Sequence, residues 1–512
     1  METIIFFCFP LFFAIYALTQ LILHKLRNLP SSPFPTLPLI GHLHLLKTPF
    51  HRALFKLSDR YGPVMLLQFG CRRVVVVTSP SAAEECFTTN DVVFANRPRL
   101  LIGKHLGYNY TSLAWSPYGN HWRNLRRIAT VEILCSHRLQ LLAHIRADEI
   151  RALIRQIFRV SQEDPGRAQD LKSLLFQLAF NVMMRMIAVK RYYGDEVELS
   201  EEVKMFQEIV SETSLLGGAK SSGDFLPFLR CFGIRQTEKR FIALHEKRDK
   251  FMQDLIDQHR EMEPGDSSGE RKRTMIEILL SLRETEPEYY TDERIKSLML
   301  VLSQAGSETT ALTMEWVMSN LLNNPRVLKK AQSEIDDLVV QDRLIDESDV
   351  AKLPYLRWVI NETMRMQPVA PLLLPHESSA ECTISGFRIP RGTMLMVNAW
   401  AIQNDPRIWE EPGKFWPERF QGLEGSKDRF KLMPFGSGRR ACPGEGLAMR
   451  VMGLALGSLI QCFDWERVSD DLVDMSAGTG ITSHKAQPLV AKCRIRPEMM
   501  QLLSGIGTKS DP

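Results

Sequence analysis

The order of apolar and polar positions divides the chain into an apolar start, a proline-rich stretch, two short strands and a long helical remainder. Thr3–Leu23 carries no charged side chain and is long enough to span a membrane. In Leu29–Gly41 the prolines are too dense for a helix or an interior strand, so we expect a stiff spacer. Two apolar runs, Pro63–Phe69 and Val74–Thr78, predict strands joined by a turn at Gly70.

The clearest helical spacing covers Asp292–Asn323 and follows a candidate cap, Thr291, so it predicts one long central helix. Glu308 and Thr309 fall in its middle among small and apolar residues, where a carboxylate is costly unless it is paired or functional. Gly306 weakens a helix by about 1 kcal/mol relative to Ala. Its missing side chain predicts room for a ligand beside the helix.

Composition excludes several classes of protein. The 512 residues hold 64 Lys and Arg against 60 Asp and Glu, a balance too even to indicate nucleic-acid binding. The nine cysteines are odd in number and include no Cys-x-x-Cys pair. This pattern argues against a disulfide framework or a zinc site and favours a reducing compartment.

One cysteine, Cys442, has surroundings that suit a metal ligand. Gly436, Gly438 and Gly444 flank it and permit the tight backbone turns that a close approach to a flat ring requires. A thiolate donates electrons strongly to haem iron, and Arg440 can pair with a haem carboxylate. The alternative is an ordinary buried cysteine in a glycine turn.

Residues 434–444 resemble the cysteine-ligand signature of the cytochrome P450 monooxygenases, Phe-x-x-Gly-x-Arg-x-Cys-x-Gly, without a mismatch. Residues 305–310, 362–365 and 417–420 resemble, in the family's order, its oxygen-activation motif, Glu-x-x-Arg and Pro-Glu-Arg-Phe. The resemblance implies a mainly α fold, a triangular helical haem-thiolate domain with a small N-terminal β-sheet, plus one N-terminal transmembrane helix. The implied parts are a membrane anchor at 1–24, a proline-rich hinge at 25–45 and a catalytic domain at 46–505.

The resemblance also implies roles for single residues. Thr309 and Glu308 would be the catalytic pair that delivers protons, although the family more often carries Asp in place of Glu308. Without the resemblance, Thr309 reads as a hydroxyl that bonds back to the preceding helical turn. Glu362, Arg365 and Arg419 would form a buried structural network that holds the Cys442 loop, where Glu362 and Arg365 alone read as an ordinary i, i+3 helix pair.

Two further groups of residues follow from position within the family pattern. The implied cofactor-binding residues are Trp122, Arg126, His376, Phe435, Gly438, Arg440 and Gly444. The implied substrate pocket comprises Leu106, Tyr110, Ala305, Val369, Ala370, Leu373, Ile481 and Thr482. By itself, His376 reads as a plain core or surface histidine.

The implied cofactor is haem b with Cys442 as axial ligand, and the implied reaction is monooxygenation with O2. The chain has no Gly-x-Gly-x-x-Gly fingerprint of its own, so NADPH electrons would come from NADPH–cytochrome P450 reductase, with cytochrome b5 as an optional second donor. Several segments resemble plant A-type enzymes near the isoflavone hydroxylases. That likeness implies hydroxylation or oxidative coupling of a phenolic, such as a flavonoid, isoflavonoid, lignan, benzophenone or xanthone.

Other functions stay open at this point. They are hydroxylation of a terpenoid or herbicide, a haem-thiolate isomerase or dehydratase, and a non-catalytic haem-binding membrane protein. For location, Lys25 and Arg27 follow the apolar start and place that flank in the cytosol by the positive-inside tendency. We therefore expect an endoplasmic reticulum membrane protein with a cytosolic catalytic domain. The aromatic stretch Asp224–Phe232 is expected to dip into the membrane interface or to pack on the core.

Overall fold

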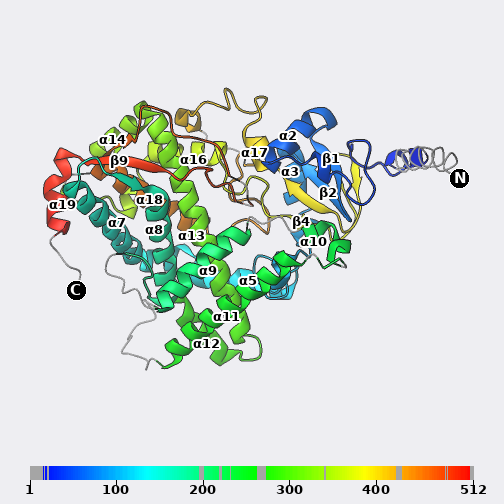
Figure 1. Cartoon of the computed structure of the whole chain (residues 1–512), viewed down its shortest axis with the longest axis horizontal. Coiled ribbons are helices and arrows are strands. Elements are labelled where there is room, and N and C mark those ends of the chain that lie inside the picture. The colour runs from blue at the N-terminus through cyan, green and yellow to red at the C-terminus, as the bar shows by residue number, and fades with distance from the viewer. Residues whose placement is uncertain are drawn as a thin grey trace.

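The computed structural model describes residues 15, 18, 19, 22, 24–194, 201–217, 222–230, 232, 233, 235–261, 273–339, 342–422, 429–478, 480 and 482–507. Helices form the larger part of the molecule, and a small sheet with its flanking helices forms the part nearest the N-terminus (Figure 1). The mainly helical fold predicted from the sequence is confirmed. The predicted membrane anchor falls almost wholly outside the described residues.

The helices in chain order are α2 (Phe50–Tyr61), α3 (Pro80–Phe87), α4 (Leu101–His105), α5 (Asn120–Arg127), α6 (Ser136–Leu141), α7 (Ala143–Glu163), α8 (Leu171–Ala188), α9 (Glu201–Gly217), α10 (Ser222–Phe225), α11 (Gln236–Glu261), α12 (Met275–Thr285), α13 (Asp292–Asn323), α14 (Pro325–Leu338), α15 (Glu347–Val350), α16 (Pro354–Met366), α17 (Ala399–Gln403), α18 (Glu445–Cys462) and α19 (Met500–Gly507). The predicted bounds of the central helix, α13, are confirmed. Its predicted cap, Thr291, occupies the cap position but makes no side-chain capping hydrogen bond.

The sheet near the N-terminus has the strand order β1-β2-β7-β4. Its strands are β1 (Val64–Phe69), β2 (Arg72–Val77), β7 (Met394–Val397) and β4 (His376–Glu377). The antiparallel β1–β2 hairpin confirms the two predicted strands, and Gly70 at its turn has a φ of +54° that favours glycine. β7 runs parallel to β2, so the sheet unites the start of the chain with a segment some 300 residues later.

Two smaller sheets complete the strands. One has the order β3-β9-β8, built from β3 (Ala168–Asp170), β9 (Val490–Ile495) and β8 (Phe463–Arg467). The other is the hairpin of β5 (Cys382–Ile384) and β6 (Phe387–Ile389).

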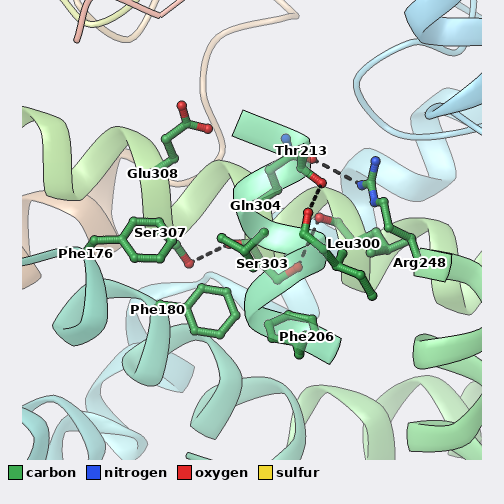
Figure 2. Close-up of a pocket in the computed structure, with 12 residues that line it drawn as sticks. Phe176, Phe180, Phe206, Thr213, Arg248, Leu300, Ser303, Gln304, Ser307 and Glu308 are labelled. Carbon is green, nitrogen blue, oxygen red and sulfur yellow. Dashed lines mark hydrogen bonds between the residues drawn. The ribbon is translucent and has the colours of Figure 1, made fainter. Parts of the chain in front are cut away.

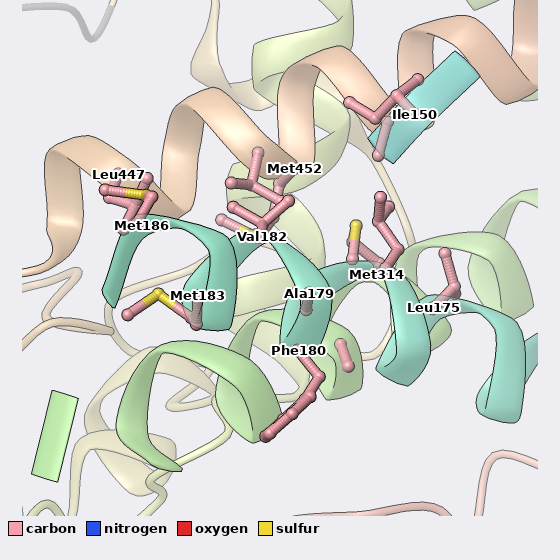
Figure 3. Packing of buried hydrophobic residues seen from close by; sticks show 14 of the residues in the cluster. Ile150, Leu175, Ala179, Phe180, Val182, Met183, Met186, Met314, Leu447 and Met452 are labelled. Carbon is pink, nitrogen blue, oxygen red and sulfur yellow. The ribbon is translucent and has the colours of Figure 1, made fainter. Parts of the chain in front are cut away.

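The main hydrophobic core forms around α8, which lies between α13 and α18 (Figure 3). Val182 and Met186 of α8 lie beside Met452 and Leu447 of α18, while Met314 of α13 packs in the same cluster. By length and composition α8 could cross a membrane, but 72% of it is buried inside the protein. Its apolar surface therefore serves the core and positions α13.

The proline-rich stretch does not stand free as a spacer. Leu66 donates its N–H to the Ser31 carbonyl at 2.9 Å, and Gly70 donates to Ile40 at 3.2 Å. This part of the chain is therefore packed along β1 and the hairpin turn, which corrects the expectation of a plain linker. Leu39 stays 74% exposed beside them.

The aromatic stretch Asp224–Phe232 has one packed end and one exposed end. Phe225 packs edge-on against Phe69 of β1, and its carbonyl accepts the Cys71 N–H at 2.9 Å. Phe228 and Phe232 instead are 38% and 77% exposed. One end of the stretch is therefore fixed on the sheet, while the other presents aromatic surface.

Candidate active site

The middle of α13 presents one open face inside an otherwise buried helix. Ala305 is exposed and Thr309, one turn later, is half-buried, whereas the following residues are buried. The Thr309 hydroxyl donates to the Ala305 carbonyl at 2.7 Å, the back-bond that a threonine makes in a helix. Gly306 does not leave room for a ligand, because a Cβ there would meet Met183 of α8 at 2.6 Å from its Sδ. The predicted groove at Gly306 is wrong: this glycine permits close helix packing.

Glu308 contacts Thr482 and also borders a cavity. Its Oε1 accepts a hydrogen bond from the Thr482 hydroxyl at 3.2 Å. Burial raises the pKa of Glu308, while Thr482 and the Lys172 ammonium lower it. Since burial has the largest effect, the carboxyl stays protonated to higher pH than an exposed glutamate does, as general acid catalysis near neutral pH requires.

Glu308 also borders a cavity on the side of α13 that faces α8, α9 and α11 (Figure 2). The cavity leaves about 40 Å³ for the centres of water-sized molecules. A buried water needs roughly 10–15 Å³ by this measure, so a few waters fit. Its lining residues are Phe176, Phe180, Phe206, Ile209, Val210, Thr213, Arg248, Leu300, Ser303, Gln304, Ser307 and Glu308. Arg248, only 4% exposed, donates to the Gln304 side chain at 3.2 Å at one end.

The loop that carries Cys442 is held by backbone geometry. The Cys442 N–H donates to the Phe435 carbonyl at 2.9 Å, which closes the loop. Gly436 and Gly438 have φ values of +71° and +70°, where other residues are strained. A Cβ at Gly438 would also meet the Asp91 carboxylate at 2.5 Å. Gly436 and Gly438 are therefore required by the fold of this loop, whereas Gly444 has an ordinary φ of −93°.

The Cys442 sulfur lies just before the N-terminus of α18. Gly444 donates its N–H to Sγ at 3.3 Å. Burial raises the pKa of the Cys442 thiol, and the Gly444 N–H and the Arg126 guanidinium lower it. A helix N-terminus favours negative charge, so the Gly444 N–H and Arg126 partly offset the effect of burial on this thiol. The Cys442 side chain is nevertheless exposed.

Other cysteines of the described chain lack this combination. Cys86, Cys462 and Cys493 are buried, and Cys493 lies 3.2 Å from the Ser161 hydroxyl. Burial raises the pKa of all three thiols.

Three arginines gather beside Cys442. Arg126 donates to the Ala441 carbonyl at 2.5 Å, and Arg440 donates to Ala95 at 2.7 Å and to Ser116 at 2.5 Å. Arg97 donates to the Leu374, Pro375 and Ala114 carbonyls. Burial, then Arg97 and Arg126, lower the pKa of Arg440 to about 8. Within the described part of the chain, none of the three has a carboxylate partner.

Clustered guanidiniums with only neutral partners suit an anionic ligand with two charges. Haem carries two propionates, and Cys442 supplies the thiolate. The residues present therefore fit haem. Arg97 was missed in the sequence, since it stands in an ordinary Asn-Arg-Pro stretch and its burial depends on distant segments.

Trp122 and His376 lie in the same cluster. The Trp122 ring lies 4.3 Å from the Arg440 guanidinium carbon, and its indole N–H donates to the Leu113 carbonyl at 3.1 Å. Its visible role is thus to support Arg440. His376 is buried with Nδ1 at 2.7 Å from the Phe94 carbonyl, and burial with Arg97 lowers its pKa well below the usual value. That contact leaves Nε2 for another partner.

A buried ion pair lies behind the loop. Glu362 and Arg365 of α16 are both 0% exposed, and Arg365 makes two hydrogen bonds to the carboxylate at 2.7 and 2.9 Å. Arg419 donates to the same carboxylate at 3.0 Å, as does the Trp416 N–H. The structure therefore brings the three predicted network residues together.

Gln403 of α17 connects this network to the cysteine loop. Its amide nitrogen donates to the Met364 and Arg365 carbonyls at 2.9 and 3.1 Å, and its carbonyl accepts the Met433 N–H at 3.0 Å. Met433 in turn accepts the Gly436 N–H at 3.1 Å. The sequence offered no signal for Gln403, because its role appears only through these contacts.

The predicted substrate residues come from separate segments. Leu106 is buried in the main core, and Tyr110 is half-buried beneath Arg99, whose guanidinium carbon lies 5.3 Å from its ring. Val369 accepts the Ser483 N–H at 2.8 Å, so its segment joins that of Thr482. Ala370 and Leu373 are half-buried in the same stretch, whereas Ile481 lies outside the described residues.

The family model for Cytochrome P450 matches residues 30–490. The chain belongs to the cytochrome P450 family. It is 50% identical to cytochrome P450 81Q32 of Catharanthus roseus, over 93% of this chain and 94% of the relative. An isoflavone 2'-hydroxylase of Glycyrrhiza echinata is 48% identical, over 92% and 93%. The (+)-piperitol/(+)-sesamin synthase CYP81Q2 of Sesamum radiatum is 46% identical, over 94% and 93%.

A solved zebrafish cytochrome P450 with abiraterone has a TM-score of 0.73 to this chain at 25% identity, covering 88% of this chain and 100% of that one. The predicted P450 fold is confirmed, as is the likeness to plant isoflavone hydroxylases. The protein is thus a monooxygenase of a family that binds haem through a cysteine thiolate and uses O2.

Removing the guanidinium in Arg365→Ala should take two hydrogen bonds and the fully buried cation from the Glu362 carboxylate, leaving Arg419 as its charged partner, and destabilise the fold by about 3–5 kcal/mol. We expect protein that retains little haem, measured by haem content after purification and by thermal unfolding. The matched control is Arg388→Ala, which breaks the exposed pair with Glu381 and should leave the unfolding temperature nearly unchanged. Equal effects of the two substitutions would contradict the network's role.

Gln403→Leu keeps the size of the side chain and removes its hydrogen bonds. Unpaired groups at Met364, Arg365 and Met433 should cost about 1–3 kcal/mol. We expect a lower unfolding temperature and a larger fraction of haem without thiolate ligation in the reduced carbon-monoxide spectrum. Gln421→Leu at an exposed position is the control. A Gln403→Leu spectrum identical to the wild type would show that this link does not hold the loop.

Proposed function

We propose that this protein is a membrane-bound, NADPH-dependent monooxygenase in which Cys442 ligates the haem iron. Arg97, Arg126 and Arg440 hold the haem propionates, with His376 beside them. The observation that carries the proposal is the accessible Cys442 sulfur at the α18 N-terminus, next to arginines with no carboxylate partner in the described chain. Bound haem supplies the activation of O2.

Protein groups control protons and exclude water in this proposal. Thr309 occupies the open face of α13, where its hydroxyl can turn from the Ala305 carbonyl toward a ligand. Glu308 passes protons to Thr309, and the cavity at its other side supplies water. The raised pKa of Glu308 keeps its carboxyl protonated to higher pH than an exposed glutamate, which suits a group that passes protons.

The substrate we propose is a plant phenolic, most simply an isoflavonoid or lignan, which the enzyme hydroxylates or couples oxidatively. Relatives at 46–48% identity carry the names isoflavone 2'-hydroxylase and (+)-piperitol/(+)-sesamin synthase. The predicted pocket residues Leu106, Val369, Ala370 and Leu373 are apolar, which suits a flat aromatic ligand.

Electrons would come from NADPH through NADPH–cytochrome P450 reductase, with cytochrome b5 as an optional donor. We place the protein on the cytosolic side of the endoplasmic reticulum membrane, anchored by its apolar N-terminus. Exposed Leu39, Phe228 and Phe232 border segments packed on the β1–β2 hairpin and support a membrane-facing surface there.

The test begins with the reduced carbon-monoxide difference spectrum of the full chain in membranes. We expect the red-shifted band of thiolate ligation, its loss in Cys442→Ala, and its retention in the control Cys493→Ala, which alters a buried cysteine. Haem-loaded wild type without that band would refute the ligand. With reductase and NADPH, a panel of isoflavones and lignans should then yield oxygenated or coupled products by mass spectrometry. Turnover of terpenoids alone would refute the phenolic assignment.

A further inference from the structure

The predicted substrate residue Thr482 lies beside a short hairpin. Gly478 donates its N–H to the His484 carbonyl at 2.8 Å, and Ala486 donates to Ser476 at 2.9 Å. A Cβ on Gly478 would collide with the His484 ring, so this hairpin requires a glycine for close approach. Thr482 is therefore part of a folded segment.

Three further contacts hold that segment in place. The Trp316 indole N–H of α13 donates to the Ser483 carbonyl at 2.8 Å, and Leu489 donates its N–H to Glu315 at 2.9 Å. Ser483 also donates to the Val369 carbonyl at 2.8 Å. The backbone next to Thr482 is thus fixed both to α13 and to a predicted wall of the substrate pocket.

The Thr482 hydroxyl is the hydrogen-bond donor that the described chain offers to the Glu308 carboxyl, at 3.2 Å. Glu308 also borders the cavity of Figure 2, where its carboxylate is directed away from the other labelled side chains, and the Lys172 ammonium is the charged group that acts on it. A carboxyl with one hydrogen bond can rotate once that bond is lost. The orientation of the Glu308 carboxyl therefore depends on Thr482.

We propose that Thr482 is a positioning residue whose hydroxyl holds Glu308 in the orientation that delivers protons at Thr309. This inference rests on the proposed roles of Glu308 and Thr309. Because Ser483 is bonded to Val369, this wall of the predicted substrate pocket and the hydrogen-bond partner of Glu308 are held together. Proton delivery is thereby coupled to correct binding of the substrate. The electrons from NADPH then form product instead of hydrogen peroxide.

The test compares Thr482→Val, which keeps the shape and removes the hydroxyl, with Thr482→Ser, which restores it. Full-length protein with reductase is given the isoflavone of highest turnover. In Thr482→Val, product per NADPH should fall about fivefold, the effect of one lost hydrogen bond, and hydrogen peroxide should rise. The substrate dissociation constant should stay within about twofold, and Thr482→Ser should recover the wild-type ratio. Thr285→Val, at an exposed site, is the control.

Infrared spectroscopy supplies a readout independent of turnover. The bands of the Glu308 side chain, assigned by their absence in Glu308→Gln, should shift in Thr482→Val and return in Thr482→Ser. Active wild type together with unchanged coupling or an unshifted band in Thr482→Val overturns the role of Thr482 alone. Wild type without turnover on any panel compound overturns this inference together with the proposed function.

Discussion

The buried pair of Glu362 and Arg365 is the constraint on which the haem side of the molecule depends. Both side chains are 0% exposed, and removing two such charges from water costs several kcal/mol for each ion. The cost is offset only when every hydrogen-bonding position is filled. The carboxylate accordingly accepts bonds from Arg365, Arg419 and the Trp416 N–H, which come from two distant parts of the chain. The hydrogen bonds to the Glu362 carboxylate therefore fix how α16 packs against the segment of Trp416 and Arg419, which precedes the cysteine loop.

The cluster of Arg97, Arg126 and Arg440 differs from this ion pair, because no described carboxylate balances its charge. Arg97, Arg126 and Arg440 repel one another, and their described partners are carbonyl oxygens. Such an arrangement is stable when an anion arrives, so folding of this region and binding of an anionic cofactor are linked. The ion pair at Glu362 fixes the loop before the cofactor binds, while the cluster is completed by the cofactor itself.

Much of this organisation could be predicted from the sequence, where the deciding information is local. The ends of α13 are marked by Thr291 and Pro325, and its predicted bounds agree with the structure. The turn at Gly70 is likewise a local feature. Contacts between distant segments could not be predicted. Arg97 is buried by residues about 280 positions later, and Gln403 is recognised only by its bonds to both α16 and Met433.

The same distinction explains why Gly306 was misread. A missing side chain in a helix predicts a close neighbour but not which one, and here Met183 of α8 fills the place expected for a ligand. Because α8 is held in the core between α13 and α18, this close packing fixes the position of α13 from behind. The open face with Ala305 and Thr309 is thereby held in place from the opposite side of the helix. Rigid packing on one face is what allows the other face to stay accessible for chemistry.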